Sequence, residues 1–596
     1  MSLSKTLAGF GLLAIAIQLS VAGDNSDTSN QSVTSSLPNG ISSGDTTQTS
    51  TVLWTRSTIK GDVRFQVKNN DGVIVDDVVS AKNPLKPVKL TVKHLRAGEK
   101  YSYKVTSPDE QSIKGTFKTA AKPNTDESLS FGVTGDWRGE LAPYPAIKNV
   151  DDKSLDFFIK LGDTIYADIA SPAVPTGQAK TLDEYRAKHQ EVYASHNDIN
   201  GFADIQRNVS IFSTIDDHEV INDFAGGALA ASDPRFSATT GLINQTALYK
   251  NGLQAFVEYN AIKNKRYSST GDSLTDGRPD LYRAQRYGLT AGVYILDARS
   301  FRDQELAGAG DLSDPAKIGS FIAQSFDVGK TNTRTMLGKK QLARLKTDLL
   351  TSQHDGVIWK FVVLPEPIQN LGVLGASDRY EGFASERSEL LGFIDGQAIK
   401  NVVFIAADIH GTVINDLTYQ HREDVLSALA ATGNPLTAPQ RMTSAFEITT
   451  GSVAFDPAFG DAVTRLLAFV PGGQIILDQL LDSVNANNLD EFKKLPMTVK
   501  NAAMHDLIDQ QLNSLGYTSI GLQDNRLIKS KLKQGSNAAL FSFGWTRFDI
   551  KPDNHSLKIT TYGIEPYTAQ DLSTKSAEII SRQPKIVSQL LVSPQP

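Results

Sequence analysis

Aspartate side chains follow most of the buried strands that this 596-residue chain is expected to form. Open α/β sheets bind their ligands beyond the carboxyl ends of their strands, so these positions share one edge. Carboxylates gathered there would repel one another unless cations lay between them. A single aspartate after a strand is also common as a turn or cap residue, so the prediction of a metal site rests on the whole set. The set comprises Asp136, Asp163, Asp216, Asp217, Asp297 and Asp408.

Histidine, tyrosine and arginine accompany these aspartates. Of nine histidines, only His218 and His410 follow buried strands, and Tyr166 stands three residues after Asp163. Two histidines among several oxygens suit hard cations, and a phenolate beside a carboxylate suits a strongly acidic ion such as ferric iron. Cations around a shared carboxylate neutralise a phosphoryl group and lower the pKa of bound water, as phosphate ester hydrolysis requires. Two roles stay open for Arg299, pairing with the acidic residues and contact with a phosphate.

The composition excludes several other classes of protein. The chain has no cysteine, which removes disulfides, zinc–thiolate sites and cysteine nucleophiles. Its 60 basic and 66 acidic residues give a net charge of −6, so no general basic field exists to bind nucleic acid. The chain also lacks a nucleophile elbow, a P-loop and a dinucleotide fingerprint, which argues against esterases, kinases and dehydrogenases.

Buried apolar runs separated by helical stretches begin at Ser128 and indicate an α/β domain whose sheet is covered on both faces. A final hairpin is predicted from two alternating runs around a turn at 552–554. The expected strands of the domain are 128–134, 156–161, 209–215, 292–297, 357–364, 401–407 and 443–449.

An all-β region precedes this domain. Apolar residues at Val63, Phe65 and Val67 alternate with polar ones, and the turn sequence Asn70-Asp71-Gly72 follows. About seven such short runs predict a small antiparallel sandwich over 39–122.

The N-terminus has the pattern of an export signal. An apolar run, 7–22, follows Lys5 and ends in small residues, which predicts a signal peptide over 1–22 and a polar linker over 23–38. No later segment reaches the length of a membrane-spanning helix. We therefore expect a periplasmic or extracellular protein.

Residues 415–540 form a long excursion and are expected to be a helical insertion. Its apolar stretch, 465–481, has three interpretations: a lid over the site, a lipid-facing hairpin, or packed helices broken at Pro471-Gly472-Gly473. Neither half can span a membrane, which favours packed helices.

Seven motifs in this order resemble the calcineurin-like metallophosphoesterase superfamily, and more closely its alkaline phosphatase D branch. The region 39–56 is similar to the entry of that branch's fibronectin-type sandwich. The motifs are LGDTIY (161–166), DDHEVINDFAGG (216–227), LYRAQRYG (281–288), LDARSFRD (296–303), TMLGKKQLARLKTDLL (335–350), DRYEGFASERSELLGFI (378–394) and ADIHG (407–411).

The resemblance implies a fold and an activity. The fold is a metallophosphoesterase-type core of two packed sheets flanked by helices over 127–596, after an all-β fibronectin-type sandwich. The activity is that of a secreted alkaline phosphatase or phosphodiesterase with one ferric ion and calcium ions, Fe3+ and Ca2+.

The resemblance also implies roles for individual residues. Asp163 would bridge metals and Tyr166 would bind iron, while Asp408 and His410 would supply the last ligands. Asp217 takes the place of the asparagine that the wider superfamily uses.

Two further roles follow from the same resemblance. His218 would orient the leaving oxygen or protonate near it, and Arg299 would hold the phosphate. The chain departs from the branch at the first core strand, where a cysteine iron ligand is common and this chain has Gly135-Asp136-Trp137. That segment is similar to the opening of the purple acid phosphatases, so we expect Asp136 to replace the thiolate.

The function expected from the sequence is hydrolysis of small phosphate monoesters by a metal-activated hydroxide. Two alternatives stay open: a phosphodiesterase acting on teichoic acid, phospholipid or similar diesters, and an inactive extracellular metal-binding protein. A monomer is expected, with no nucleic-acid partner.

Overall fold

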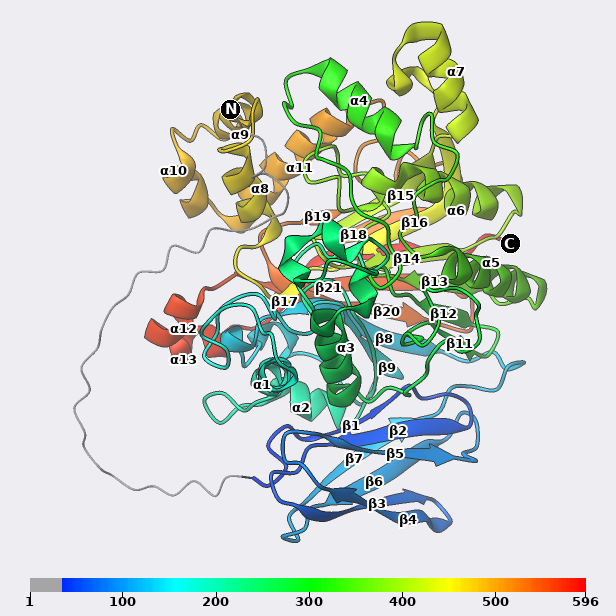
Figure 1. Ribbon diagram of the computed structural model, residues 1–596, viewed down its shortest axis with the longest axis vertical. Coiled ribbons are helices and arrows are strands. Elements are labelled where there is room, and N and C mark those ends of the chain that lie inside the picture. Colours follow the sequence, from blue (N-terminus) through cyan, green and yellow to red (C-terminus); the bar gives the residue numbers. More distant parts are fainter. Residues whose placement is uncertain (1–34) are drawn as a thin grey trace.

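Figure 1 shows the computed structural model of the protein, which describes residues 35–596. The predicted signal peptide, 1–22, and most of the predicted linker, 23–38, lie outside the described residues. Within 35–596, no helix has both the length and the apolar character needed to cross a membrane.

The N-terminal strands form two antiparallel layers, at the bottom of Figure 1. In β3, Val63, Phe65 and Val67 are buried, as their alternation predicts. One layer has the order β4-β3-β6-β7, and the other contains β1, β2 and β5. The strands are β1 (Ile41–Gly44), β2 (Ser50–Thr55), β3 (Gly61–Asn69), β4 (Gly72–Ala81), β5 (Val88–Lys93), β6 (Lys100–Thr106) and β7 (Ser112–Lys118).

Strand β1 joins this region to the main sheet. It pairs in parallel with β10, with Gly44 opposite Ile211, so β1, β2 and β5 extend an 11-stranded sheet. A Cβ on Gly44 would lie 2.5 Å from the carbonyl oxygen of Ile211 and would also meet the carbonyl oxygen of Ala261. Only glycine permits this close approach of backbones. The alternating pattern did not predict this continuity, because it describes each strand by itself.

Two sheets pack face to face to form the core. The large sheet runs β18-β22-β21-β20-β8-β9-β10 before it reaches β1, and the second sheet has the order β11-β12-β13-β14-β16-β15-β19. The rings of Phe131 and Phe361 meet between the sheets, with centroids 5.0 Å apart. All seven strands predicted between 128 and 449 are present. They are β8 (Leu129–Trp137), β9 (Phe157–Leu161), β10 (Ser210–Thr214), β12 (Ala291–Ile295), β13 (Trp359–Val363), β14 (Val402–Ala406) and β16 (Arg441–Thr449).

The remaining strands complete the two sheets. The predicted C-terminal hairpin is formed by β20 and β21, which pair in antiparallel fashion. These strands are β11 (Arg283–Tyr287), β15 (Thr412–Tyr419), β17 (Ser452–Ala454), β18 (Ser530–Gly535), β19 (Ala538–Ala539), β20 (Phe543–Ile550), β21 (Leu557–Ile564) and β22 (Lys585–Val592).

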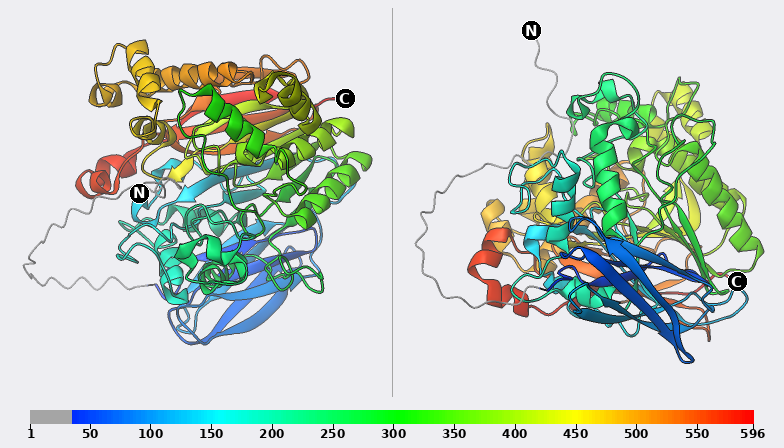
Figure 2. Two further views of the ribbon diagram at one scale, coloured as in Figure 1. Left: turned by 45° about the horizontal axis from the view of Figure 1, so that its top comes forward. Right: turned by 60° about the horizontal axis from the view of Figure 1, so that its bottom comes forward.

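Helices cover the outer face of each sheet, which confirms the predicted architecture of two packed sheets flanked by helices. Apolar residues of α1, α2 and α3 pack against the large sheet, and those of α5 and α6 pack against the second. Figure 2 shows the sheets between these helices. The helices are α1 (Leu182–Val192), α2 (Gly201–Gln206), α3 (Ala247–Tyr259), α5 (Lys339–His354) and α6 (Ala384–Gly396), with α12 (Ala569–Thr574) and α13 (Ser576–Ser581) near the C-terminus.

A second group of helices lies above the strand ends, at the top of Figure 1. The segment 415–540 was expected to be a helical insertion, and this is wrong in part. It contains β16, which lies between β14 and β15 in the second sheet, so the sheet itself runs through this segment. The predicted helix break is found at Gly472, which has φ +76°. The helices are α4 (Pro315–Ser325), α7 (Arg422–Thr432), α8 (Phe459–Leu467), α9 (Gly473–Ser483), α10 (Leu489–Lys494) and α11 (Met497–Ser514).

Candidate metal centre

The parallel strands deliver their acidic residues to one edge of the core. Strands β8, β9 and β10 run in the same direction in the large sheet, and β12, β13 and β14 do so in the second. Their carboxyl ends therefore meet, which brings together residues that are far apart in the chain. Three groups of side chains result, each with ligand atoms within 4.8 Å of one another.

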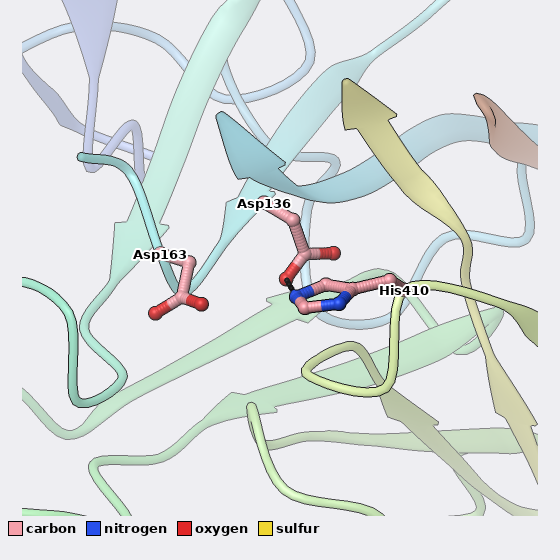
Figure 3. Close-up of side chains that lie close together, drawn as sticks. All are labelled: Asp136, Asp163 and His410. Carbon is pink, nitrogen blue, oxygen red and sulfur yellow. Dashed lines mark ion pairs between the residues drawn. The ribbon is translucent and has the colours of Figure 1, made fainter. Parts of the chain in front are cut away.

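The first group contains Asp136, Asp163 and His410 (Figure 3). Nε2 of His410 lies 3.8 Å from Oδ1 of Asp136. The hydroxyl oxygen of Tyr166 lies 3.2 Å from the same nitrogen and 3.5 Å from the same carboxylate oxygen. The ring of Phe455 stacks on His410 with centroids 3.6 Å apart, which fixes the imidazole against the cavity wall. Carboxylate, imidazole and phenol therefore surround one position, as the sequence predicts.

The second group contains Asp163, Asp217 and His218. Because Asp163 belongs to both groups, it lies between the two positions. Oδ1 of Asp217 accepts a hydrogen bond from the backbone N–H of His218 at 2.9 Å, and Oδ2 accepts one from the N–H of Asp223 at 2.5 Å. These bonds hold the Asp217 carboxylate in one orientation.

His218 has a partner that the sequence reading missed. Its Nδ1 lies 2.6 Å from Oδ1 of Asp168, which is two residues after Tyr166 in the same loop. Burial opposes protonation of His218, but the carboxylates of Asp168 and Asp217 outweigh it and raise its pKa to about 10. The spacing from the LGDTIY motif was the available signal, since Asp168 is the second residue after it.

The third group contains Glu366, Asp378 and Asp408. Asp408 follows β14 as predicted, but Glu366 and Asp378 were not among the predicted site residues. Glu366 lies three residues beyond the end of β13. The rule that ligands bind beyond the carboxyl ends of parallel strands applies to Glu366 as well.

Arg299 lies inside this acidic group and is 0% exposed. Its Nε is 2.6 Å from Oδ1 of Asp216, its two terminal nitrogens are each 2.8 Å from oxygens of Asp378, and it also pairs with Glu366. It does not line the cavity above the site. This geometry contradicts the phosphate contact expected of Arg299, because its guanidinium is already surrounded by carboxylates and closed off from the cavity.

Asp297 also differs from its companions. Its Oδ1 accepts hydrogen bonds from the backbone N–H groups of Arg299 and Ser300, at 3.0 and 2.9 Å. It therefore stabilises the turn after β12 and belongs to none of the three groups.

The backbone at the site is strained. Four candidate ligands have a positive φ: Asp136 at 61°, Asp163 at 46°, Asp408 at 67° and His410 at 59°. Each such residue costs about 1–3 kcal/mol, and strain of this kind concentrates at functional sites. The rest of the fold therefore holds these four residues in a costly backbone conformation, which places their side chains at the site.

The acidic residues fit a role as metal ligands. Burial, then the neighbouring carboxylates, raises the pKa of Asp136, Asp163 and Asp408 well above the usual range. Oδ2 of Asp136 and Oε2 of Glu366 are buried and make no hydrogen bond. Buried carboxylates without enough donors are stabilised by cations, which would also restore their ionised form. Oxygen ligands with a few imidazoles suit hard metal ions.

A cavity of about 320 Å³ opens above the three groups. Asp163, Asp217, His218, Asp408 and His410 lie at its polar end. Its other walls come from the loop 371–375 and from α8, α9 and α11. A small molecule in this cavity would reach the candidate ligands directly.

Comparison with known families decides the assignment of the chain. The model of the PhoD-like phosphatase family matches residues 134–504, and the model of the PhoD-like phosphatase N-terminal domain matches residues 22–121. The chain belongs to the PhoD-like phosphatase family. The matched regions contain the N-terminal strands and all three acidic groups of this PhoD-like protein.

The chain is also similar to one curated protein and to two solved structures. Alkaline phosphatase D of Bacillus subtilis (strain 168) is 26% identical over 414 residues, which cover 63% of this chain and 65% of that protein. The match thus spans slightly less than two thirds of the relative. A solved structure of PhoD superposes with a TM-score of 0.59 at 18% identity and covers 92% of this chain and 99% of that chain, which shows a shared fold. A purple acid phosphatase from yellow lupin seeds gives a TM-score of 0.46 at 9% identity, over 94% of this chain and 75% of that chain.

Proposed function

We propose that this PhoD-like protein is an exported, metal-dependent phosphoesterase that hydrolyses phosphate monoesters. The observation that carries the proposal is the convergence of three acidic groups at the polar end of one cavity. The family and the relative named alkaline phosphatase D support the same reaction class. Export is proposed from the apolar run 7–22 alone.

Each acidic group has a proposed ligand role. Asp136, Asp163, Tyr166 and His410 would hold a ferric ion, with Asp136 in the place of the family's cysteine. Asp217, in the second group with the shared Asp163, and Asp408, in the third group, would hold calcium. When bound, these cations would neutralise the phosphoryl group and make hydroxide available at alkaline pH.

The protein's own residues supply positioning and proton transfer. Asp168 holds Nδ1 of His218, which leaves Nε2 as the nitrogen that can serve a ligand in the cavity. We assign His218 as the group that protonates the departing oxygen. The proposed role of Arg299 is to neutralise Asp216, Glu366 and Asp378 and so to hold the third group in shape.

The proposal is tested with Asp163→Asn, because Asp163 belongs to two of the acidic groups. The variant is expected to lose at least 99% of the hydrolysis of nitrophenyl phosphate at pH 8 to 9, while circular dichroism stays unchanged. Elemental analysis of the wild-type protein is expected to find iron and calcium. A variant with full activity would refute the proposal.

Diester hydrolysis is the second candidate, and the size of the cavity favours it. The walls beyond the acidic groups leave room for a second substituent on phosphorus. Comparing rates on nitrophenyl phosphate and bis(nitrophenyl) phosphate separates the two specificities. Metal bound without turnover of either ester would instead indicate an inactive metal-binding protein.

A further inference from the structure

The cavity above the candidate metal centre has two chemically different ends. One end is polar and carries the carboxylates and histidines described above. The other end is lined mainly by apolar side chains from α8, α9 and α11, together with Leu312 before α4 and Ile318 within it. Gln511 and Ser514 of α11 are the polar side chains that these helices add to the wall. A substrate that fills this cavity would therefore contact charged and polar side chains at one end and an apolar surface at the other.

Two helices present mostly apolar faces to this space. In α8, the lining residues stand at i, i+3, i+4, i+7 and i+8. In α11, the apolar lining residues stand at i, i+3 and i+4, and Leu515 follows the end of the helix. Such spacing places side chains on one side of a helix. The residues are Phe459, Ala462, Val463, Leu466 and Leu467 in α8, Met504, Leu507 and Ile508 in α11, and Leu515 just beyond α11.

Several of these side chains are not fully packed by protein. Val463, Leu466 and Ile476 are only half-buried, although each faces the cavity. Two apolar side chains close by are exposed: Phe469, in the turn between α8 and α9, is 83% exposed, and Ile475, in α9, is 59% exposed. Apolar surface left uncovered next to a site is characteristic of ligand-binding grooves.

We infer that the organic group of the natural phosphate ester is a linear alkyl chain, and that α8, α9 and α11 bind this chain. The inference rests on the proposed function, since it places the phosphate at the polar end of the same cavity. A polar alcohol, such as a sugar or glycerol, would leave most of its hydroxyl groups without partners, because Gln511 and Ser514 are the polar side chains that these helices offer. An alkyl chain would instead bury its methylene groups there.

The reaction would then release a long-chain alcohol. The oxygen of water bonds to phosphorus, the bond between phosphorus and the alkyl oxygen breaks, and that oxygen takes a proton from His218. The water proton restores the imidazolium, so the sum is one ester and one water giving one alcohol and one phosphate. The apolar wall would hold the alkyl group before and after this step.

The chain-length dependence of hydrolysis tests the inference. The metal-loaded mature protein is assayed for phosphate release from butyl, hexyl and octyl phosphate, each below its micelle-forming concentration. Full burial of a methylene group corresponds to about a fourfold gain in binding. We expect kcat/KM to rise at least tenfold from butyl to octyl phosphate, with most of the gain in KM.

Two neighbouring residues of α9 provide the variant and its control. Ile476 lines the cavity, whereas Ile475 points outward. Ile476→Gln is expected to lower the ratio of kcat/KM for octyl over butyl phosphate at least fivefold. Ile475→Gln is expected to keep both this ratio and the activity on nitrophenyl phosphate.

Failure of the inference differs from failure of the proposed function. Hydrolysis of nitrophenyl phosphate together with a flat chain-length profile would overturn the alkyl-chain inference and leave the phosphoesterase in place. An Ile475→Gln variant that loses the chain-length gain as fully as Ile476→Gln would also overturn it. Absence of turnover on every ester would refute both.

Discussion

Nδ1 of His218 lies 2.6 Å from Oδ1 of Asp168, and Oδ2 of Asp168 accepts a hydrogen bond from the backbone N–H of Asn222 at 2.8 Å. The carboxylate is thus fixed from one side and orients the imidazole on the other. This arrangement leaves Nε2 of His218 as the nitrogen able to act in the cavity. We therefore assign Asp168 as the residue that positions the proposed proton donor.

The first prediction concerns this pair. Asp168→Asn is expected to lower kcat on an alkyl phosphate at least about tenfold, with little change in KM, because proton donation to the alkoxide becomes less effective. The loss on nitrophenyl phosphate is expected to be smaller, since nitrophenolate leaves without help. Steady-state kinetics on both esters make the comparison, with the exposed Asp204→Asn as control. Equal losses on the two esters would contradict the role of Asp168.

The second prediction concerns Arg299. Arg299→Met would leave the buried carboxylate of Asp216 without its cation. Glu366 and Asp378 would keep only their ion pairs with Arg302. Breaking a buried ion pair from one side costs about 3–5 kcal/mol in the free energy of unfolding. Urea denaturation of the metal-free protein measures this loss, and Arg64→Met, from an exposed pair with Asp76, serves as control. A small loss for Arg299→Met would mean that these carboxylates are neutral or otherwise compensated.

The third prediction concerns Asp136, which stands where the family commonly has a cysteine. Asp136→Ala is expected to lose bound iron, because it removes an oxygen from the group formed with Asp163 and His410. Asp136→Cys is expected to keep about one iron and to change its visible absorption, since a thiolate replaces a carboxylate. Elemental analysis and absorption spectroscopy give the answer. Iron retained in Asp136→Ala would show that Asp136 is not a ligand.

The fourth prediction concerns pH and Lys160. This side chain of β9 is 0% exposed, lies among Trp137, Tyr193 and Phe202, and has its pKa lowered by burial to about 7. Between pH 7 and the ordinary lysine pKa of 10.5, the unfolded chain holds a proton that the folded chain lacks, so folding becomes more favourable as pH rises. Below pH 7, both states are protonated and the full cost of the buried charge remains.

The difference between wild type and Lys160→Met isolates this effect. We expect the free energy of unfolding of wild type, relative to the variant, to increase by a few kcal/mol between pH 7 and 10. Urea unfolding at several pH values measures it, with the exposed Lys114→Met as control. A difference that does not change with pH would show that Lys160 stays protonated in the folded protein.

The fifth prediction concerns the junction between β1 and β10. Gly44→Ala is expected to destabilise the protein by about 1–3 kcal/mol, because the added Cβ meets the carbonyl oxygen of Ile211. Gly396→Ala, whose Cβ would meet no atom within 4 Å, is expected to be neutral or slightly stabilising. Thermal unfolding compares the two. Equal stability of both variants would mean that the close approach of β1 to β10 at Gly44 does not contribute to stability.

Local patterns were sufficient to predict the strands and the acidic edge of the core. Alternation at Val63, Phe65 and Val67 gave the correct buried face, because side chains of a strand point to opposite sides in turn. The strand-end rule brought Asp136, Asp163 and His410 into one prediction, and the structure places their ligand atoms within 4.8 Å of one another. These features depend only on residues within a few positions of each other.

The tertiary structure alone decided which groups neutralise one another and which sheet each strand joins. The sequence around Arg299 is compatible with phosphate binding. The tertiary structure surrounds its guanidinium with Asp216, Glu366 and Asp378, which leaves no room for that role. The parallel pairing of Gly44 with Ile211 and the apolar walls of the cavity likewise join segments far apart in the chain. Sequence periodicity predicts which face of a helix or strand is buried. Which strands pair, and which charged side chains neutralise one another, depends on which distant elements meet in the fold.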